Sequence, residues 1–411
     1  MTGEQIWRQW PISELALQVC LSIQSNADNN VNKSFESEHS TTIENPLIDS
    51  VELSPLPNGL DHLHEFIQAH KGQLKTYVPE YLELDKILVQ NADILAVETL
   101  ASIPIRNIHL PIPLLTLGNP AASETTLLVT ASIHGVERIG TQALLAWLQS
   151  LVQRYRWDSL WRSQFEQEVA LVIMPMVNPA GMYLNQRANG NGVDINRNAP
   201  IEAEDPVPFL LGGQRISNRL PWYRGKKNAS MEIELSMLEG VIDRFTQRMK
   251  PVIALDIHSG FGFKNQLWIP YAFRKQPISD IPLYMALKIL WERNYPNHNY
   301  VFEPQSNAYL SHGDVWDYFH RKCQKQGKLL LPLTLEMGSW NWIKKRPIQL
   351  LSFSGLFHPT VPHRHARVLR QHLGLMDFLL AATRNFDAWK PKGDQWYAME
   401  QVAQSMWYLD N

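Results

Sequence analysis

The sequence predicts an α/β protein with a mixed, mostly parallel central sheet and helices on both faces, preceded by a flexible N-terminal extension. The first observation is a series of short apolar runs, each as long as a buried strand, at 126–132, 169–177, 252–257 and 329–335. The second is the helical periodicity of other segments, at 141–155, 231–249, 283–294 and 366–382. Strands that alternate with helices form mostly parallel sheets that are covered on both sides. Finally, no repeat with a period of about 20 to 50 residues occurs, which excludes solenoids and propellers.

Length and composition favour a globular protein without a nucleic-acid or membrane partner. The chain has 411 residues, of which 45% are hydrophobic and 19% are charged, as in folded domains. Its 38 Lys and Arg residues are balanced by 40 Asp and Glu residues, so it lacks the basic excess of a polyanion binder. No apolar run approaches the roughly 20 residues that span a bilayer. Two cysteines are too few for a disulfide framework or a thiolate metal site, and a cytoplasmic location is expected.

The chain is expected to have three parts. Residues 1–74 form an N-terminal extension, in which residues 24–50 are rich in Ser, Asn, Thr and Glu. Such a segment buries too little apolar surface to offset the entropy lost on ordering, so it is expected to be flexible. Residues 75–390 contain the strand and helix signals and form the main domain, and residues 391–411 form a C-terminal tail. The helix expected at 366–382 and the residues before it are rich in His and Arg, which indicates a solvated basic face or, as the alternative, a second metal site.

Four chemically versatile residues follow or end the predicted strands. The strand at 126–132 leads directly to His134 and Glu137, the strand at 252–257 leads to His258, and the strand at 329–335 leads to Glu336. In open α/β sheets, binding sites form where the carboxyl ends of the strands open into loops. The sequence therefore predicts that these four side chains lie at one edge of the sheet.

Their residue types match a hydrolytic metal site. His134 and Glu137 are three residues apart, so both can point at one ion from one helical turn. With His258 they make a His2Glu set, which is the ligand composition of a catalytic zinc site with an open fourth position. Zinc in such a site lowers the pKa of bound water to about 7, and Glu336 could accept the proton and pass it to a leaving nitrogen. Asp256, two residues before His258, could orient its ring.

A second motif lies between the metal-ligand candidates. Asn-Pro-Ala-Gly occupies 178–181 and is followed by Arg-Ala-Asn-Gly-Asn-Gly-Val-Asp-Ile-Asn-Arg-Asn at 187–198. The arginines could pair bidentately with a carboxylate. Taken alone, the segment favours the interpretation of surface arginines with an Asp194 that supports a loop.

Together these motifs resemble the M14 family of zinc metallocarboxypeptidases. The resemblance covers roughly residues 75–384 and consists of six segments in the family's order. They are HGVE at 134–137, NPAG at 178–181, RANGNGVDINRN at 187–198, WYRGKKNASMEIEL at 222–235, DIHS at 256–259 and LEMG at 335–338. The resemblance implies a carboxypeptidase-like fold for residues 75–390, which would be the catalytic domain.

The family's functional residues transfer to matching positions. The resemblance implies that His134, Glu137 and His258 bind one Zn²⁺ per chain and that Glu336 acts as general base and then as general acid. Arg187 would stabilise the oxyanion. Asn196 and Arg197 would hold the terminal carboxylate of a peptide, which limits cleavage to the last residue.

The sequence departs from the family pattern in three places. Ala180 stands where the family has Asp, which should alter a supporting contact rather than the mechanism. Tyr309 is the nearest candidate for the family's mobile tyrosine, although its register differs by one or two residues. Asp314 is expected near the side-chain pocket, where it would favour C-terminal Lys or Arg.

Three functions compete, of which the third belongs to a different class. The first is a zinc carboxypeptidase that acts on peptides, including cell-wall peptides if the host is bacterial. The second is a zinc deacylase of small N-acyl amino acids, as in the desuccinylase and aspartoacylase group. The third is a non-catalytic relative that binds peptides. Neither the physiological substrate nor the oligomeric state can be inferred from these residues.

Overall fold

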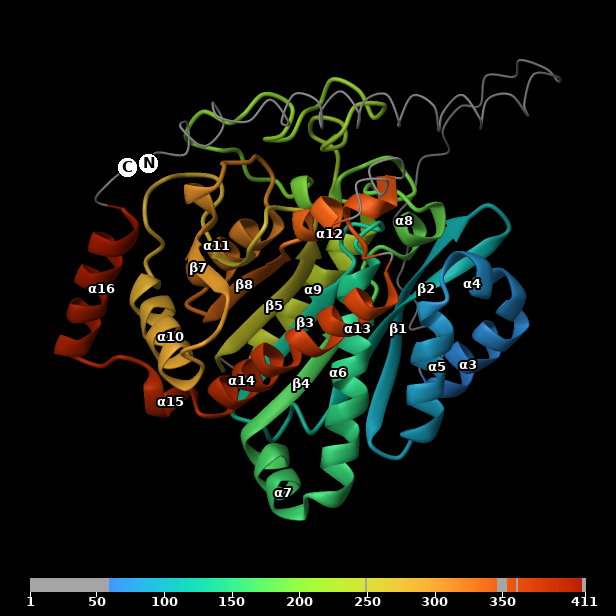
Figure 1. Ribbon diagram of the computed structural model, residues 1–411, viewed down its shortest axis with the longest axis horizontal. Helices are drawn as coiled ribbons and strands as arrows, with labels where there is room; N and C mark the ends of the chain where they lie inside the picture. The colour runs from blue at the N-terminus through green and yellow to red at the C-terminus, as the bar shows by residue number, and fades with distance from the viewer. Residues whose placement is uncertain (1–58, 248–249, 346–352, 360, 409–411) are drawn as a thin grey trace.

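The computed structural model describes residues 59–247, 250–345, 353–359 and 361–408 (Figure 1). Most of the expected N-terminal extension, including its polar segment at 24–50, lies outside the described residues. Within the described part of the chain, no helix combines the length and the apolarity that a membrane crossing requires.

The described residues form a mixed sheet of eight strands in the order β1-β2-β4-β3-β5-β8-β6-β7. The central pairs β4–β3, β3–β5 and β5–β8 are parallel, and so is β6–β7. The pairs β1–β2, β2–β4 and β8–β6 are antiparallel. The strands are β1 (Leu95–Ile105), β2 (Ile108–Leu117), β3 (Thr125–Ala131), β4 (Val169–Met174), β5 (Val252–Ser259), β6 (Asn265–Ile269), β7 (Tyr300–Pro304) and β8 (Leu330–Met337).

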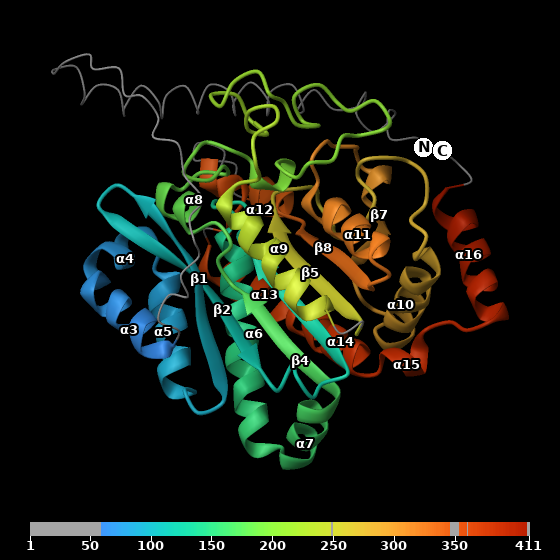
Figure 2. The ribbon, with the colours of Figure 1, turned by 180° about the vertical axis from the view of Figure 1, so that it is seen from behind.

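Helices cover both faces of the sheet, as the sequence predicts (Figures 1 and 2). The larger apolar core includes residues of α3 (Leu60–Ala69), α4 (Lys71–Tyr77), α5 (Glu80–Gln90), α6 (Arg138–Trp157), α7 (Ser159–Glu168), α10 (Ile281–Asn294), α13 (Pro362–Gln371), α14 (Leu373–Arg384), α15 (Phe386–Trp389) and α16 (Asp394–Trp407). The smaller core lies under α9 (Ile233–Thr246) and α11 (Val315–Lys325). Two short helices, α8 (Pro179–Leu184) and α12 (Trp340–Lys345), flank the loops near the carboxyl ends of the central strands.

The four predicted strands are confirmed as β3, β4, β5 and β8. They are buried along almost their whole length, as expected of parallel strands covered on both faces. The helix expected at 366–382 is instead divided into α13 and α14, with His372 between them. His372 is 1% exposed and its Nδ1 lies 2.8 Å from the hydroxyl of Tyr300. The expected solvated basic face therefore does not include His372.

Both ends of the described chain pack onto the sheet layers. Leu63 and Ile67 of α3 and Leu74 of α4 are buried in the larger core, and α3 contacts β1. A division after residue 74 would cut α4. Helix α16, which lies in the expected C-terminal tail, packs against α10 and buries Trp407.

Candidate active site

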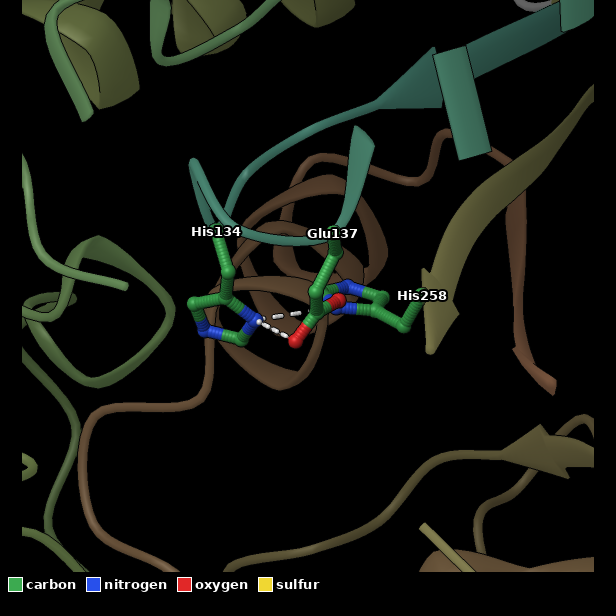
Figure 3. Close-up of side chains that lie close together, drawn as sticks. All are labelled: His134, Glu137 and His258. Carbon is green, nitrogen blue, oxygen red and sulfur yellow. Dashed lines mark hydrogen bonds and ion pairs between the residues drawn. The ribbon is translucent and has the colours of Figure 1, made fainter. Parts of the chain in front are cut away.

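His134, Glu137 and His258 meet in one buried cluster (Figure 3). The Nδ1 atoms of His134 and His258 lie 3.2 Å apart, and each lies 2.9 Å from a carboxylate oxygen of Glu137. One ligand atom from each residue falls within 4.8 Å of the other two. The structure therefore brings together the three predicted ligands, although they come from positions 124 residues apart.

The turn that carries His134 and Glu137 is held against the start of α8. The two residues lie in the turn between β3 and α6, and α6 begins directly after Glu137. A Cβ atom on Gly135 would lie 2.0 Å from the carbonyl carbon of Gly181, so a side chain at Gly135 would force the two segments apart. The side chain of Asn178 accepts a hydrogen bond from the Gly181 N–H and donates one to the Ile133 carbonyl. The Asn-Pro-Ala-Gly segment thus supports the ligand turn.

In each histidine ring, the Nε2 atom contacts the carboxylate of an aspartate. The Nε2 atom of His258 lies 2.6 Å from Asp256, the contact that the sequence predicted, and Nε2 of His134 lies 3.1 Å from Asp194. Such contacts fix the orientation and tautomer of a metal-binding imidazole and raise its basicity. Burial opposes ionisation of Asp194, but Arg187 and His134 hold its pKa well below the ordinary value. Asp194 was expected only to support a loop, so its contact with His134 was missed.

The donor set fits zinc. Two neutral imidazole nitrogens and one carboxylate are the ligands of hydrolytic zinc sites. In both rings Nε2 contacts Asp194 or Asp256, and Nδ1 points toward Glu137. All three side chains are nearly inaccessible to solvent, yet they line a cleft of about 830 Å³. A metal held by these three residues would therefore keep one side open to a substrate.

Glu336 lies beside this cluster. Strands β5 and β8 pair in parallel with His258 opposite Glu336, so the two side chains lie next to each other at the edge of the sheet. The carboxylate of Glu336 accepts a hydrogen bond of 3.0 Å from the Phe261 N–H and lines the cleft. Burial and the nearby charge of Glu137 raise the pKa of Glu336 to about 8. A divalent cation bound nearby would favour the ionised form and lower this pKa.

Arg187 also contacts this cluster. Its Nε donates to Asp194 at 2.9 Å and its Nη1 donates to Glu137 at 3.3 Å. Its side chain is 21% exposed and lines the cleft. These contacts fix the guanidinium beside the candidate metal ligands, and part of it faces the cleft.

Asn196, Arg197 and Tyr309 also line the cleft. Arg197 is almost fully buried, and its Nη2 lies 3.3 Å from the hydroxyl of Tyr309. Within the described residues, Nε of Arg197 and Oδ1 of Asn196 have no hydrogen-bond partner. Tyr309, the candidate for the mobile tyrosine, thus contacts Arg197 at the wall of the cleft.

Asp314 is the predicted site residue that the structure separates from the cleft. Its side chain is buried and accepts hydrogen bonds from the N–H groups of Trp316 and Asp317, which caps α11. It is absent from the described lining of the cleft. The N-terminus of α11 thus engages the carboxylate that was expected near the side-chain pocket.

Residues outside the predicted motifs form the outer walls of the cleft. They are Arg106 in the turn between β1 and β2, Leu184 to Gln186 at the end of α8, the part of the loop at 211–223 that precedes Trp222, and Phe357. None of these segments has a chemical signature or a periodic pattern, so sequence reasoning did not find them.

Comparison with known proteins agrees with this geometry. The family model "Zinc carboxypeptidase" (Peptidase M14) matches residues 109–339. Carboxypeptidase SOL1 of Arabidopsis thaliana is 36% identical over 69 residues, which cover 17% of this chain and 14% of that protein. Murein peptide amidase A of Escherichia coli K12 is 38% identical over 88 residues, which cover 21% of this chain and 31% of that protein. These matches thus span less than a third of each curated relative.

The fold also has a counterpart among solved structures. The crystal structure of thrombin activatable fibrinolysis inhibitor superimposes with a TM-score of 0.55, at 15% identity, over 80% of this chain and 74% of that one. At this identity the similarity concerns the fold alone. The family model, however, covers more than half of the chain and spans His134, Glu137, His258 and Glu336. The chain therefore belongs to the M14 family of zinc carboxypeptidases.

Proposed function

We propose that this protein is a zinc-dependent metallocarboxypeptidase that hydrolyses the last amide bond of peptides. The observation that carries the proposal is a single cleft lined by two kinds of group. One is the cluster of His134, Glu137 and His258, and the other is the buried, partly unpaired guanidinium of Arg197. The first suits amide hydrolysis, and the second suits recognition of a chain-terminal carboxylate.

The chain's own residues would divide the chemistry between them. Zinc, when bound to His134, Glu137 and His258, supplies a Lewis acid that lowers the pKa of a water ligand to about 7. Glu336 accepts a proton at its carboxylate and returns it to the leaving nitrogen. Arg187 donates N–H groups to the carbonyl oxygen of the scissile bond as negative charge develops there.

Recognition of the terminal carboxylate would restrict cleavage to the last residue. Arg197 and the side-chain amide of Asn196 would donate to this carboxylate, and the Tyr309 hydroxyl lies next to Arg197 to complete the contact. Because these groups lie in the same cleft as Glu336, a bound terminus holds one scissile bond in position and excludes internal bonds.

The pocket next to Tyr309 favours an uncharged last side chain. The residues lining that part of the cleft include Trp268, whose ring centroid is 5.8 Å from that of Tyr309, together with Gln305 and Thr334. Among the described lining residues, the carboxylates are those of Glu137, Asp194 and Glu336. With Asp314 engaged at α11, no acid remains there to bind a cationic Lys or Arg side chain.

Two related amide hydrolases remain second candidates. The short match to murein peptide amidase A favours an amide bond in a cell-wall peptide. A deacylase of small N-acyl amino acids shares the same ligand types, but a cleft of about 830 Å³ is at the upper end for small-molecule sites and suits a longer substrate. Peptide substrates are therefore preferred.

The test compares wild type with Glu336→Gln. Metal content is measured by mass spectrometry, and cleavage is measured with a library of N-blocked peptides that differ in the last residue. We expect about one zinc per chain in both proteins, and release of single, preferably uncharged, C-terminal residues by wild type alone.

Loss of a general base of this kind should lower kcat by about 10² to 10⁴. Hydrolysis of N-acyl amino acids or murein peptides in place of ordinary peptides would favour the second candidates. A wild-type protein without zinc after purification in zinc-containing buffer would contradict the proposal.

A further inference from the structure

We propose that the outer cleft selects peptides that carry acidic residues upstream of the scissile bond, and that Arg106 and Arg219 bind these carboxylates. The inference rests on the proposed function and names its substrate class. It starts from the charges on the cleft wall. The charged side chains among the described lining residues, histidines aside, are Arg106, Glu137, Arg187, Asp194, Arg197, Arg219 and Glu336.

The three carboxylates among them are already engaged at the catalytic centre. Glu137 contacts both histidine rings, Asp194 contacts His134 and Arg187, and Glu336 accepts the Phe261 N–H. Elsewhere the described cleft wall contains no acid. The other polar side chains on this outer wall include the amides of Asn185, Gln186, Asn191 and Asn218. Of these amides, Asn191 already donates to Glu232 and Gln186 to the Asn189 carbonyl. The charged side chains on the outer wall are therefore the two arginines, and bound zinc would add to their positive charge.

Arg106 has a well-defined support. It projects from the turn between β1 and β2, and its guanidinium carbon lies 5.8 Å from the centre of the Tyr183 ring. Tyr183 is 4% exposed, stacks on Tyr77 at 4.5 Å and accepts a hydrogen bond from Gln73 at its hydroxyl. Within the described residues no carboxylate pairs with Arg106. A guanidinium that rests on a fixed ring and lacks an anionic partner is well placed to bind a carboxylate of the substrate.

Arg219 belongs to the loop at 211–223, which is held from within by Gln214. The side-chain amide of this buried residue donates to the carbonyls of Ser217, Leu220 and Pro221. The side-chain oxygen Oε1 of Gln214 accepts hydrogen bonds from the backbone N–H groups of Ile216 and Ser217. The loop is thus an ordered wall. Arg219 is exposed, lines the cleft and has no anionic partner within the described residues.

Arg106 contacts a different part of the cleft from the groups proposed to bind the chain terminus. Arg197 contacts the hydroxyl of Tyr309, whereas the guanidinium of Arg106 lies over the ring of Tyr183 in α8. The residues that follow α8 also line the cleft. A peptide whose terminal carboxylate is held by Arg197 would extend its preceding residues along this outer wall. Carboxylates on those residues would meet Arg106 and Arg219, and cationic residues would be repelled.

The experiment uses N-acetylated peptides with one neutral last residue and with Glu, Gln or Lys at the two positions before the cleaved residue. At low ionic strength we expect kcat/KM to fall in the order Glu, Gln, Lys, with a factor of about 3 to 10 between Glu and Gln peptides. The factor should shrink when salt is added, because these contacts are exposed. In the double variant Arg106→Gln/Arg219→Gln, the Glu-to-Gln ratio should approach one.

Lys227→Gln is the matched control. It removes one cation from an exposed residue just after the loop at 211–223 without touching the described cleft lining, so it should keep the wild-type ratio. Equal kcat/KM for Glu and Gln peptides in wild type, or a ratio unaltered in the double variant, would overturn the inference.

Binding separates this inference from the proposed function. Calorimetry with Glu336→Gln, in the presence or absence of the two arginine substitutions, measures Kd for the same peptides without turnover. If wild type hydrolysed none of them, the proposed function would fail, and a Glu-over-Gln preference in Kd that depends on Arg106 and Arg219 would still support the inference. A Kd without such a preference would overturn it.

Discussion

At the scale of single residues, Asp194 and Asp256 contact the rings of His134 and His258, the two histidines proposed to bind zinc. Asp256 and His258 are two residues apart in β5, so their side chains lie on the same face of the strand, and the contact could be predicted from the sequence. Asp194 is 60 residues from His134 and lies in a loop, where no periodicity relates it to the histidine. Its role became apparent only from the folded chain.

Asp256→Asn should weaken zinc binding. Asp256 accepts hydrogen bonds from Thr130 and Trp316 and contacts His258. An amide of the same size would fit but would lose the negative charge that strengthens the imidazole as a ligand. We expect the Kd for zinc, measured by competition with a chelator, to rise about 10- to 100-fold.

Asp314→Asn is the control for zinc affinity, because Asn caps helices as well as Asp does and Asp314 does not contact the ligands. Equal zinc affinity in Asp256→Asn and wild type would show that Asp256 does not support His258 as a ligand.

At the scale of elements, the strands that carry the chemistry were predictable and the flanking ones were not. β3, β4, β5 and β8 are buried apolar runs of sufficient length. β2 is as buried, but Pro111 and Pro113 interrupt it and are typical of loops or edge strands. β6 and β7 have only five residues each, too few for a periodicity to be recognised.

Glu234 in helix α9 should make the free energy of unfolding fall as the pH rises. This residue in its first turn is 1% exposed, and burial raises its pKa to about 7. In the unfolded chain the carboxyl group releases its proton near pH 4.5. In the folded chain the carboxyl group stays protonated up to about pH 7. The unfolded state therefore binds fewer protons in this window, and stability falls as the pH rises through it.

Glu234→Gln should remove this loss, because Gln resembles the protonated carboxyl group and can still accept the Asn189 side-chain N–H. The free energy of unfolding of the variant, relative to wild type, should increase between pH 4.5 and pH 8 by up to about 3 kcal/mol. Denaturant titrations at both pH values measure it. A difference between the two proteins that does not change with pH would show that Glu234 titrates normally.

At the scale of the whole molecule, the cleft joins segments from Arg106 to Phe357, and this explains which parts of the site could be predicted. The motif residues have distinctive chemistry and follow recognisable strands. The outer walls are loops whose positions depend on long-range packing, such as the contact of Arg106 with Tyr183. Nothing local in the sequence encodes these contacts.

The same long-range packing links the helices before β1 to the catalytic centre. Leu63 of α3 is 1% exposed and belongs to the same apolar core as Ala131, the last residue of β3, and Ile257 of β5. Strand β3 leads to His134, and strand β5 contains His258. If α3 forms one cooperative unit with the sheet, a cavity at Leu63 should destabilise the whole catalytic domain.

We expect Leu63→Ala to lower the free energy of unfolding by about 2 to 5 kcal/mol, with a single transition at a lower temperature when both protein fluorescence and retained zinc are followed. Glu65→Ala is the control, because Glu65 is exposed on the same helix. Two separate transitions, with zinc retained after the first, would instead show that α3 belongs to an independent N-terminal unit. In that case, the boundary expected near residue 74 would separate two units that unfold independently. The packing of α3 on β1 would then be a contact between these units.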